Sequence, residues 1–222
     1  MNSKSYKTLP PESDTLPPPT HPTHLTPAPP STMPSKISEK ATHAFALVSL
    51  VYSVLLGLSL GTKKGWRLFT YHPLLLTVAT SIFVIAAMYK KIGGLQYTRL
   101  HGNLSFLGLC LVLGGVSAIY YNKEWNAHSS HFESNHALLG GSVLSIMCIL
   151  LLNGLIAIHP DWGKLKTNKT IRLAHKMTGR FILVSMCFAI WQGAKKVAPG
   201  FYETDVAVGV PAAFWAFLLF WA

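Results

Sequence analysis

Charged side chains are scarce in this chain. Asp, Glu, Lys and Arg make up only 12% of the 222 residues, whereas 50% are hydrophobic, and the mean hydropathy is +0.35. Soluble domains carry about 25% charged residues, so the composition excludes an ordinary soluble domain and indicates a membrane protein. Acidic residues are rarest, with 8 against 19 Lys and Arg. Such an excess collects in cytosolic loops of membrane proteins, so we expect no nucleic-acid partner.

Cysteine is also rare. The three cysteines, Cys110, Cys148 and Cys187, lie in apolar runs without metal-ligand spacing, and we expect them to pack as small hydrophobic residues. The alternating pattern of strands is missing too. The sequence therefore favours an all-α fold.

The first 35 residues differ in composition from the rest. Residues 1–35 are rich in Pro, Ser and Thr and hold too little apolar content to form a core, so we expect a disordered cytosolic tail. They lack the apolar stretch and cleavage site of a signal peptide, so the first apolar helix is expected to anchor the chain. We expect residues 36–222 to form one transmembrane domain.

Six apolar segments follow the tail. Each is close to the length of about 20 residues that crosses a hydrocarbon core about 30 Å thick. The fifth segment holds Lys176 and Arg180 near its start, and the other five hold no charged residue. We therefore predict an all-α membrane protein with a six-transmembrane-helix bundle. The last segment ends with the sequence, and we expect the natural chain to continue beyond Ala222. The segments are residues 41–62, 68–89, 100–122, 134–160, 173–194 and 206–222.

The basic residues predict the orientation. If the tail lies on one side of a six-helix bundle, the loops after the second and fourth segments share that side, and together they hold most of the Lys and Arg. The positive-inside rule then places both termini in the cytosol. The sequence predicts a multi-pass protein of an endomembrane, such as the endoplasmic reticulum or a vesicle, or of the plasma membrane, without choosing between them.

Four histidines are predicted to open four successive helices, those of the second to fifth apolar segments. Because successive helices reverse direction, His72 and His136 are expected at the non-cytosolic level, and His101 and His175 at the cytosolic level. A single histidine at a helix end is more often an interfacial polar residue, but ionisable residues within spans are functional by default. Two facing pairs suit two haem b groups, each held by axial imidazoles from two helices. The C-x-x-C-H motif that attaches haem covalently does not occur, so we expect both groups to be bound non-covalently. Helix rise would place the irons roughly 20 Å apart.

The sequence around these histidines resembles the cytochrome b561 family, closest to its small stand-alone b561-domain proteins. The resemblance covers residues from about 40 to the end. It implies six helices, two b haems held by the four central helices, and electron transfer from cytosolic ascorbate to monodehydroascorbate or ferric iron across the membrane. Such a protein is a transmembrane ascorbate-dependent oxidoreductase. The matching stretches are YHPLLL at His72, RLHGNLSFLG at His101, SNHALLGG at His136 and AHKMTGR at His175.

Candidate substrate residues flank both predicted haem levels. Ascorbate is an anion, so cations at the cytosolic level would attract it, although the positive-inside rule alone also explains them. Gln96 occupies a place where the family often has lysine. At the opposite level, histidines of the loop before His136 could hold the acceptor or ferric iron, or belong to a solvated loop. The candidates are Lys90, Lys91, Arg99, Arg172 and Lys176 on the cytosolic side, and His128 and His131 on the other.

Two other functions remain open at this stage. A dihaem b cytochrome could serve quinone or a partner protein. A non-enzymatic transporter or scaffold could use the histidines to relay protons or only to pack, but transporters often show inverted repeats and interrupted helices, and we see neither. Bilayer lipid is an expected partner in every case, and a homodimer is left open.

Overall fold

The computed structural model describes residues 38–63, 65–127, 130–197 and 209. All five α-helices in these ranges are long and apolar enough to cross a membrane, so the predicted all-α membrane fold is confirmed for them. The predicted tail, residues 1–35, and the predicted sixth helix, residues 206–222, lie outside the described residues. The helices are α1 (Glu39–Gly61), α2 (Tyr71–Ile92), α3 (Leu95–Asn122), α4 (Asn135–Ile156) and α5 (Lys169–Val197), with a 3₁₀ turn η1 (Leu68–Thr70) before α2 and a π-helical turn η2 (Lys123–Ala127) after α3.

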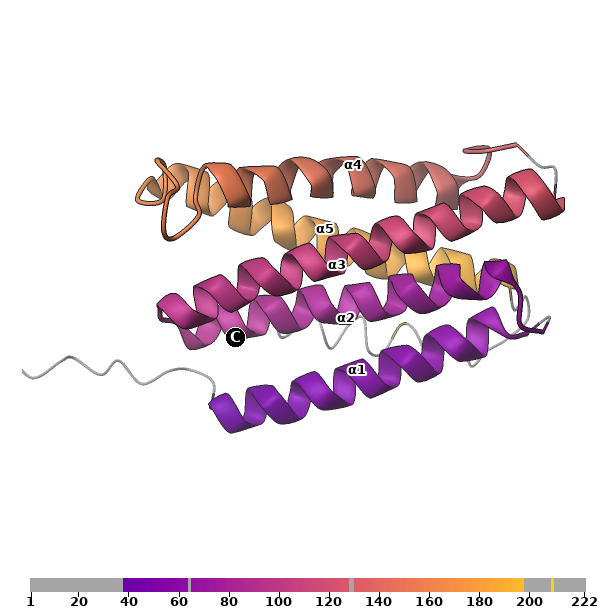
Figure 1. Cartoon of the computed structure of the whole chain (residues 1–222), viewed down its shortest axis with the longest axis horizontal. Helices are drawn as coiled ribbons and strands as arrows, with labels where there is room; N and C mark the ends of the chain where they lie inside the picture. The colour runs from indigo at the N-terminus through magenta and orange to yellow at the C-terminus, as the bar shows by residue number, and fades with distance from the viewer. Residues whose placement is uncertain (1–37, 64, 128–129, 198–208, 210–222) are drawn as a thin grey trace, which may run out of the picture. The chain divides into compact units, whose positions relative to one another are not determined.

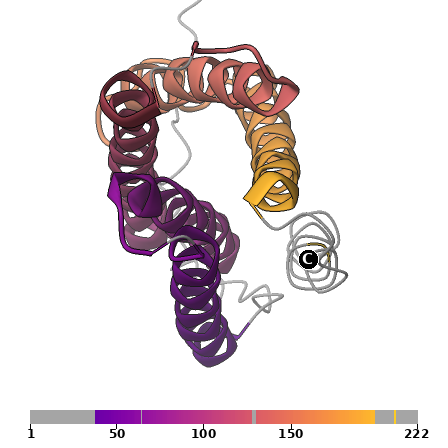
Figure 2. The same cartoon turned by 90° about the vertical axis from the view of Figure 1, so that its right-hand side faces the viewer.

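The five helices lie side by side with their axes roughly aligned (Figure 1). The end-on view shows α2, α3, α4 and α5 following one another along an arc, with α1 packed outside on α2 (Figure 2). An apolar cluster at mid-length draws one or two residues from each of α2 to α5. Its members are Ala79, Val112, Val143, Met147, Ile182 and Met186.

Small and polar residues hold α1 against α2. A Cβ added at Gly57 would stand 2.6 Å from the Cα atom of Leu74, so the two backbones approach closely. The Ser53 hydroxyl bonds the Ser81 hydroxyl, and the Thr77 hydroxyl donates to the Ser53 carbonyl at 2.9 Å. Close approach and hydroxyl bonds of this kind join helices in lipid, where the hydrophobic effect between them is weak. This seam fixes the position of α2.

Two helices begin earlier than the apolar runs suggest. α3 starts at Leu95 and α5 at Lys169, six residues before His101 and His175 respectively. Gly93 and Gly94, with φ of 93° and 85°, turn the chain between α2 and α3 within two residues. The prediction that His101 and His175 open their helices is therefore wrong, because both lie almost two turns inside them. His72 and His136 are the second residues of α2 and α4, as predicted.

Candidate haem sites

The structure brings the four predicted histidines together as two pairs. The ring centroids of His72 and His136 are 6.2 Å apart with an interplanar angle of 90°. Those of His101 and His175 are 6.4 Å apart at 79°. One pair joins α2 to α4 and the other joins α3 to α5, and all four residues are partly buried. Each pair therefore offers two imidazoles from two different helices.

The ring spacing suits one metal ion between each pair. A metal–imidazole bond is about 2 Å long and the ring centre lies about 1 Å behind the bonding nitrogen, so two rings on opposite sides of one metal have centres about 6 Å apart. The spacings of 6.2 and 6.4 Å agree with this value. The described residues contain no group of three or more His, Cys, Asp and Glu that could hold a metal. A metal here would take its other ligands from a cofactor, as haem iron does from porphyrin.

Main-chain carbonyls orient three of the four rings through their Nδ1 atoms. A carbonyl can only accept a hydrogen bond, so each Nδ1 carries the proton and each Nε2 is left unprotonated for a metal. His175 differs, because its buried Nδ1 has no hydrogen-bond partner. The three bonds run from His72 to the Gly115 oxygen at 2.9 Å, from His101 to the Ala86 oxygen at 3.0 Å, and from His136 to the Ala189 oxygen at 2.9 Å.

Two glycines that sequence reasoning missed make room for the rings. A Cβ added at Gly193 on α5 would stand 3.0 Å from Cε1 of His136, and one at Gly154 on α4 would stand 3.3 Å from Cε1 of His175. Both spacings are tighter than ordinary van der Waals contact. The imidazoles of His136 and His175 therefore each lie directly against a glycine of the neighbouring helix.

Residues 71–199 match the family model described as eukaryotic cytochrome b561. This chain belongs to that family. The match covers α2 to α5 and all four histidines, whereas comparison with curated protein sequences finds no match. Family members bind haem b and transfer electrons across membranes, so this b561 protein is a multi-pass transmembrane oxidoreductase of the haem-dependent kind. Its two histidine pairs have ring spacings that suit a haem iron.

The predicted ascorbate cluster of this b561 protein is only partly assembled. Arg99 forms two bonds with Asp161, from Nε to Oδ2 at 3.1 Å and from Nη2 to Oδ1 at 2.6 Å. The pKa of the Asp161 carboxyl lies below its usual value, chiefly because the Arg99 guanidinium donates to it. The ion pair ties the α4–α5 loop to α3. Arg99 is thus already neutralised by a carboxylate of the protein.

The remaining cations of this cluster lie on α2 and α5. Lys90 is exposed, and its Nζ atom donates to the Thr98 hydroxyl at 2.6 Å. Arg172 and Lys176 are exposed on α5, and Lys91 is partly buried at the end of α2. Lys90 in the last turn of α2 and Arg172 in the first turn of α5 are thus exposed cations that could attract an anion.

At the opposite end of the b561 core, His131 is held by its own loop. Its Nε2 lies 2.7 Å from Oε1 of Glu124, and its ring stacks on Tyr120 with centroids 4.5 Å apart. The Lys123 ammonium donates to the Ser130 carbonyl at 2.5 Å. His128 lies outside the described residues. Only one carboxylate, that of Glu124, is seen to contact His131 within the described part of the loop.

Proposed function

We propose that this protein transfers electrons through two haem b groups from cytosolic ascorbate to monodehydroascorbate or ferric iron on the other side of the membrane. The presence of two histidine pairs on the same four helices, each spaced to bridge one iron, carries the proposal. His72 and His136 would hold one haem, and His101 and His175 the other. When bound, each haem supplies one-electron redox chemistry. The protein holds the rings, sets their tautomers and excludes water.

The helices set the distance between the two pairs. Gly115, whose carbonyl orients His72, lies fourteen residues after His101 on α3. At 1.5 Å per residue, the two levels are about 21 Å apart. The apolar cluster of Ala79, Val112 and their neighbours lies between the two levels on all four helices and keeps that region dry. This separation supports the placing of one haem near each membrane surface.

The topology we propose follows from charge. The C-terminal end of α2, the α4–α5 loop and the start of α5 lie at the His101–His175 end. They carry the lysines Lys90, Lys91, Lys164, Lys166 and Lys169. The positive-inside rule assigns this end to the cytosol. With residues 206–222 as a sixth helix and residues 1–35 as a tail, both termini are then cytosolic. The charges do not distinguish an endomembrane from the plasma membrane.

Lys90 and Arg172 are our candidates for attracting ascorbate. Both are exposed, they come from different helices, and they lie at the end of the bundle that holds His101 and His175. The positive charges of both side chains would attract an anionic substrate. Arg99 contributes less, because Asp161 already occupies its guanidinium.

The purified full-length protein in lipid vesicles tests the function. We expect a spectrum of two b-type haems, reduction of both by external ascorbate, and reduction of ferric citrate or monodehydroascorbate held inside the vesicles. Haems that quinol reduces and ascorbate does not would favour a dihaem cytochrome serving quinone. A colourless folded protein would favour a transporter or scaffold. Vesicles with reducible haems and an unreactive internal acceptor would refute transfer across the membrane.

A further inference from the structure

α2 and α3 each orient the histidine of the other helix through a main-chain carbonyl, and the sequence offset is the same in both cases. His72 on α2 donates to the carbonyl of Gly115, which lies fourteen residues after His101 on α3. His101 in turn donates to the carbonyl of Ala86, which lies fourteen residues after His72 on α2. Fourteen residues are close to four helical turns, so the histidine and the carbonyl lie on the same face of each helix. The two bonds are reciprocal.

α4 and α5 show one half of this arrangement. His136 on α4 donates to the carbonyl of Ala189, fourteen residues after His175 on α5. The reciprocal acceptor for His175 would be the carbonyl of Leu150, fourteen residues after His136 on α4. His175 is the histidine whose buried Nδ1 has no partner. The one hydrogen bond missing from the pattern is therefore the bond that the unpartnered Nδ1 of His175 would make.

The two glycines that lie against the rings are the same number of residues after the histidine of their own helix. Gly193, which lies against His136, is eighteen residues after His175, and Gly154, which lies against His175, is eighteen residues after His136. On both helices the glycine is four residues after the carbonyl position of the pattern. Each ring therefore meets the neighbouring helix at the same relative height.

The sequence itself repeats this arrangement. Residues 136–154 and 175–193 both fit the pattern H-x3-G-x12-[NQ]-G, with Asn153 before the final glycine in α4 and Gln192 in α5. The pattern includes the histidine, a glycine one turn later and the glycine that faces the other ring. Three positions agree in residue type and a fourth is an amide in both helices, so α4 and α5 have matched faces toward each other.

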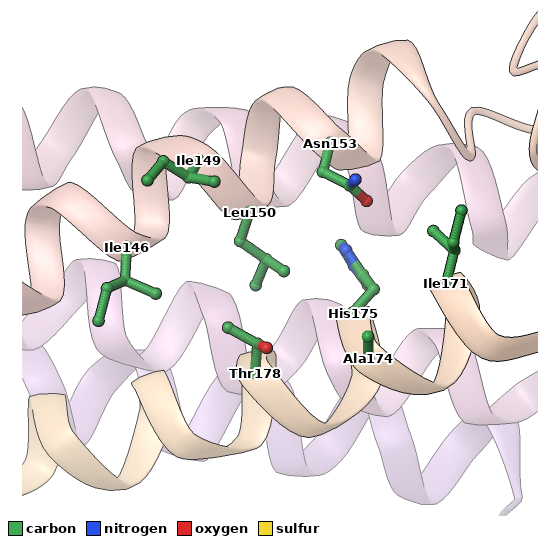
Figure 3. A pocket seen from close by; sticks show the side chains of 8 residues that line it. All are labelled: Ile146, Ile149, Leu150, Asn153, Ile171, Ala174, His175 and Thr178. Atoms are coloured by element: carbon green, nitrogen blue, oxygen red, sulfur yellow. The ribbon is translucent and has the colours of Figure 1, made fainter.

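On the α4 side, the surroundings of His175 include the Leu150 carbonyl and the Asn153 amide oxygen. A pocket of about 260 Å³ between α4 and α5 is lined by His175, Leu150, Asn153 and Thr178 among others. Asn153 and His175 point toward one another across it, and the Leu150 side chain lies beside them (Figure 3). The Leu150 carbonyl and the Asn153 amide oxygen are thus rival partners for Nδ1. The repeat favours Leu150, because Gln192, the counterpart of Asn153, does not hold His136.

We propose that α4–α5 has the same reciprocal hydrogen-bond arrangement as α2–α3, in which each helix orients the haem ligand of its partner helix, and that the Leu150 carbonyl accepts the Nδ1 hydrogen of His175. The inference rests on the proposed role of the histidines as haem ligands. Each haem then takes one ligand from each hairpin, as in a parallel repeat about an axis along the membrane normal. An imidazole whose Nδ1 hydrogen is accepted is a stronger ligand, and it favours ferric iron.

Weakening the Leu150 carbonyl tests the bond. Replacing Leu151 by its α-hydroxy acid in the full-length, haem-loaded protein converts the Leu150 peptide carbonyl to an ester, which is a poorer acceptor, while all side chains stay the same. The midpoint potential of the His101–His175 haem should rise and that of the other haem should not. Loss of such partners changes metal affinity about 10–100-fold. A tenfold loss confined to the ferric state is a rise of about 59 mV.

Matched variants decide between the acceptors. The same replacement at Ile190 weakens the Ala189 carbonyl and should raise the potential of the His72–His136 haem alone. Placed at Leu152, it should change neither haem. Asn153→Leu should leave both potentials unchanged, and Gly154→Ala, which adds a methyl against the His175 ring, should shift only the His101–His175 haem. Haems are assigned by the signal lost in His175→Ala.

Two outcomes would overturn the inference. One is a shift in Asn153→Leu without a shift from the Leu151 replacement, which would make Asn153 the acceptor. The other is an unchanged potential of the His101–His175 haem in the Leu151 replacement when the Ile190 replacement does shift the other haem. Absence of haem from the unaltered protein would instead refute the proposed function, so the two failures are distinguishable.

Discussion

Alanine variants of the four histidines should lose haem one group at a time. His101→Ala removes one ligand from one pair. The other pair lies about 21 Å away along α3, beyond the 7–10 Å within which substitutions usually affect one another. We therefore expect haem content to fall from about two per chain to about one, with the surviving haem unchanged in its spectrum and potential.

Double variants test the pairing itself. His101→Ala with His175→Ala removes both ligands of one pair, and the chain should still bind about one haem. His101→Ala with His72→Ala breaks both pairs, and the chain should bind none. If ligands were instead shared within a hairpin, His72 with His101, this second variant would keep one haem. The ring spacings of 6.2 and 6.4 Å, both across hairpins, predict the first result.

The pyridine haemochrome assay, scaled to protein by amino-acid analysis, measures the count. The ferric protein should also give strongly anisotropic low-spin electron paramagnetic resonance signals, because the ring planes are nearly perpendicular at 90° and 79°. One haem retained in His72→Ala with His101→Ala would refute the pairing. No haem in His101→Ala alone, in protein that still folds, would refute the independence of the two sites.

Three further predictions concern the charged residues and the glycosylation acceptor at the His101–His175 end. The double variant Lys90→Gln with Arg172→Gln should slow haem reduction by ascorbate about tenfold in stopped-flow measurements at low salt, and the effect should be smaller near 1 M salt. Arg99→Gln should slow the reduction less. Equal rates in the wild type, the double variant and Arg99→Gln would contradict a role of Lys90 and Arg172 in attracting ascorbate. The hydrogen bond from Arg99 keeps the pKa of Asp161 below its usual value. The ion pair should therefore stabilise the α4–α5 loop above about pH 4 and should cease to do so as the pH falls through the lowered pKa. If hydrogen exchange in residues 157–168 had the same pH dependence in Asp161→Asn as in the wild type, this prediction would be wrong. Asn168-Lys169-Thr170 is a glycosylation acceptor that we place in the cytosol and expect to be unmodified, and a glycan lost in Asn168→Gln would invert the orientation.

The pairing of the histidines could be predicted from the sequence. Reversal of direction between successive helices puts alternate histidines at the same membrane level, and apolar runs locate the helices without any knowledge of packing. The helix starts could not be predicted in the same way. α3 begins in the polar stretch Leu95–Arg99, because a helix can extend beyond the hydrocarbon region and the two glycines before it make the turn.

The partners of the rings could not be predicted from residue types. The Gly115, Ala86 and Ala189 groups that hold them are main-chain carbonyls, which every residue carries. Only the resulting offsets leave a trace in the sequence. The shared H-x3-G-x12-[NQ]-G pattern of α4 and α5 could have been found before the structure, but its meaning required the observation that Gly154 and Gly193 lie against the opposite rings.

The ion pair of Arg99 and Asp161 changes how the basic residues at the His101–His175 end should be interpreted. The two residues are 62 positions apart in the sequence, so no local pattern predicts their contact. Arg99 is two residues before His101 on α3, and Asp161 belongs to the loop that leads into α5, the helix of His175. A planar guanidinium that bonds a carboxylate through two nitrogens fixes direction as well as distance. The pair therefore joins α3, the helix of His101, to the loop that leads into α5, the helix of His175. Lys90 and Arg172, which have no carboxylate of this kind among the contacts seen in the described residues, are better placed to meet an anionic substrate.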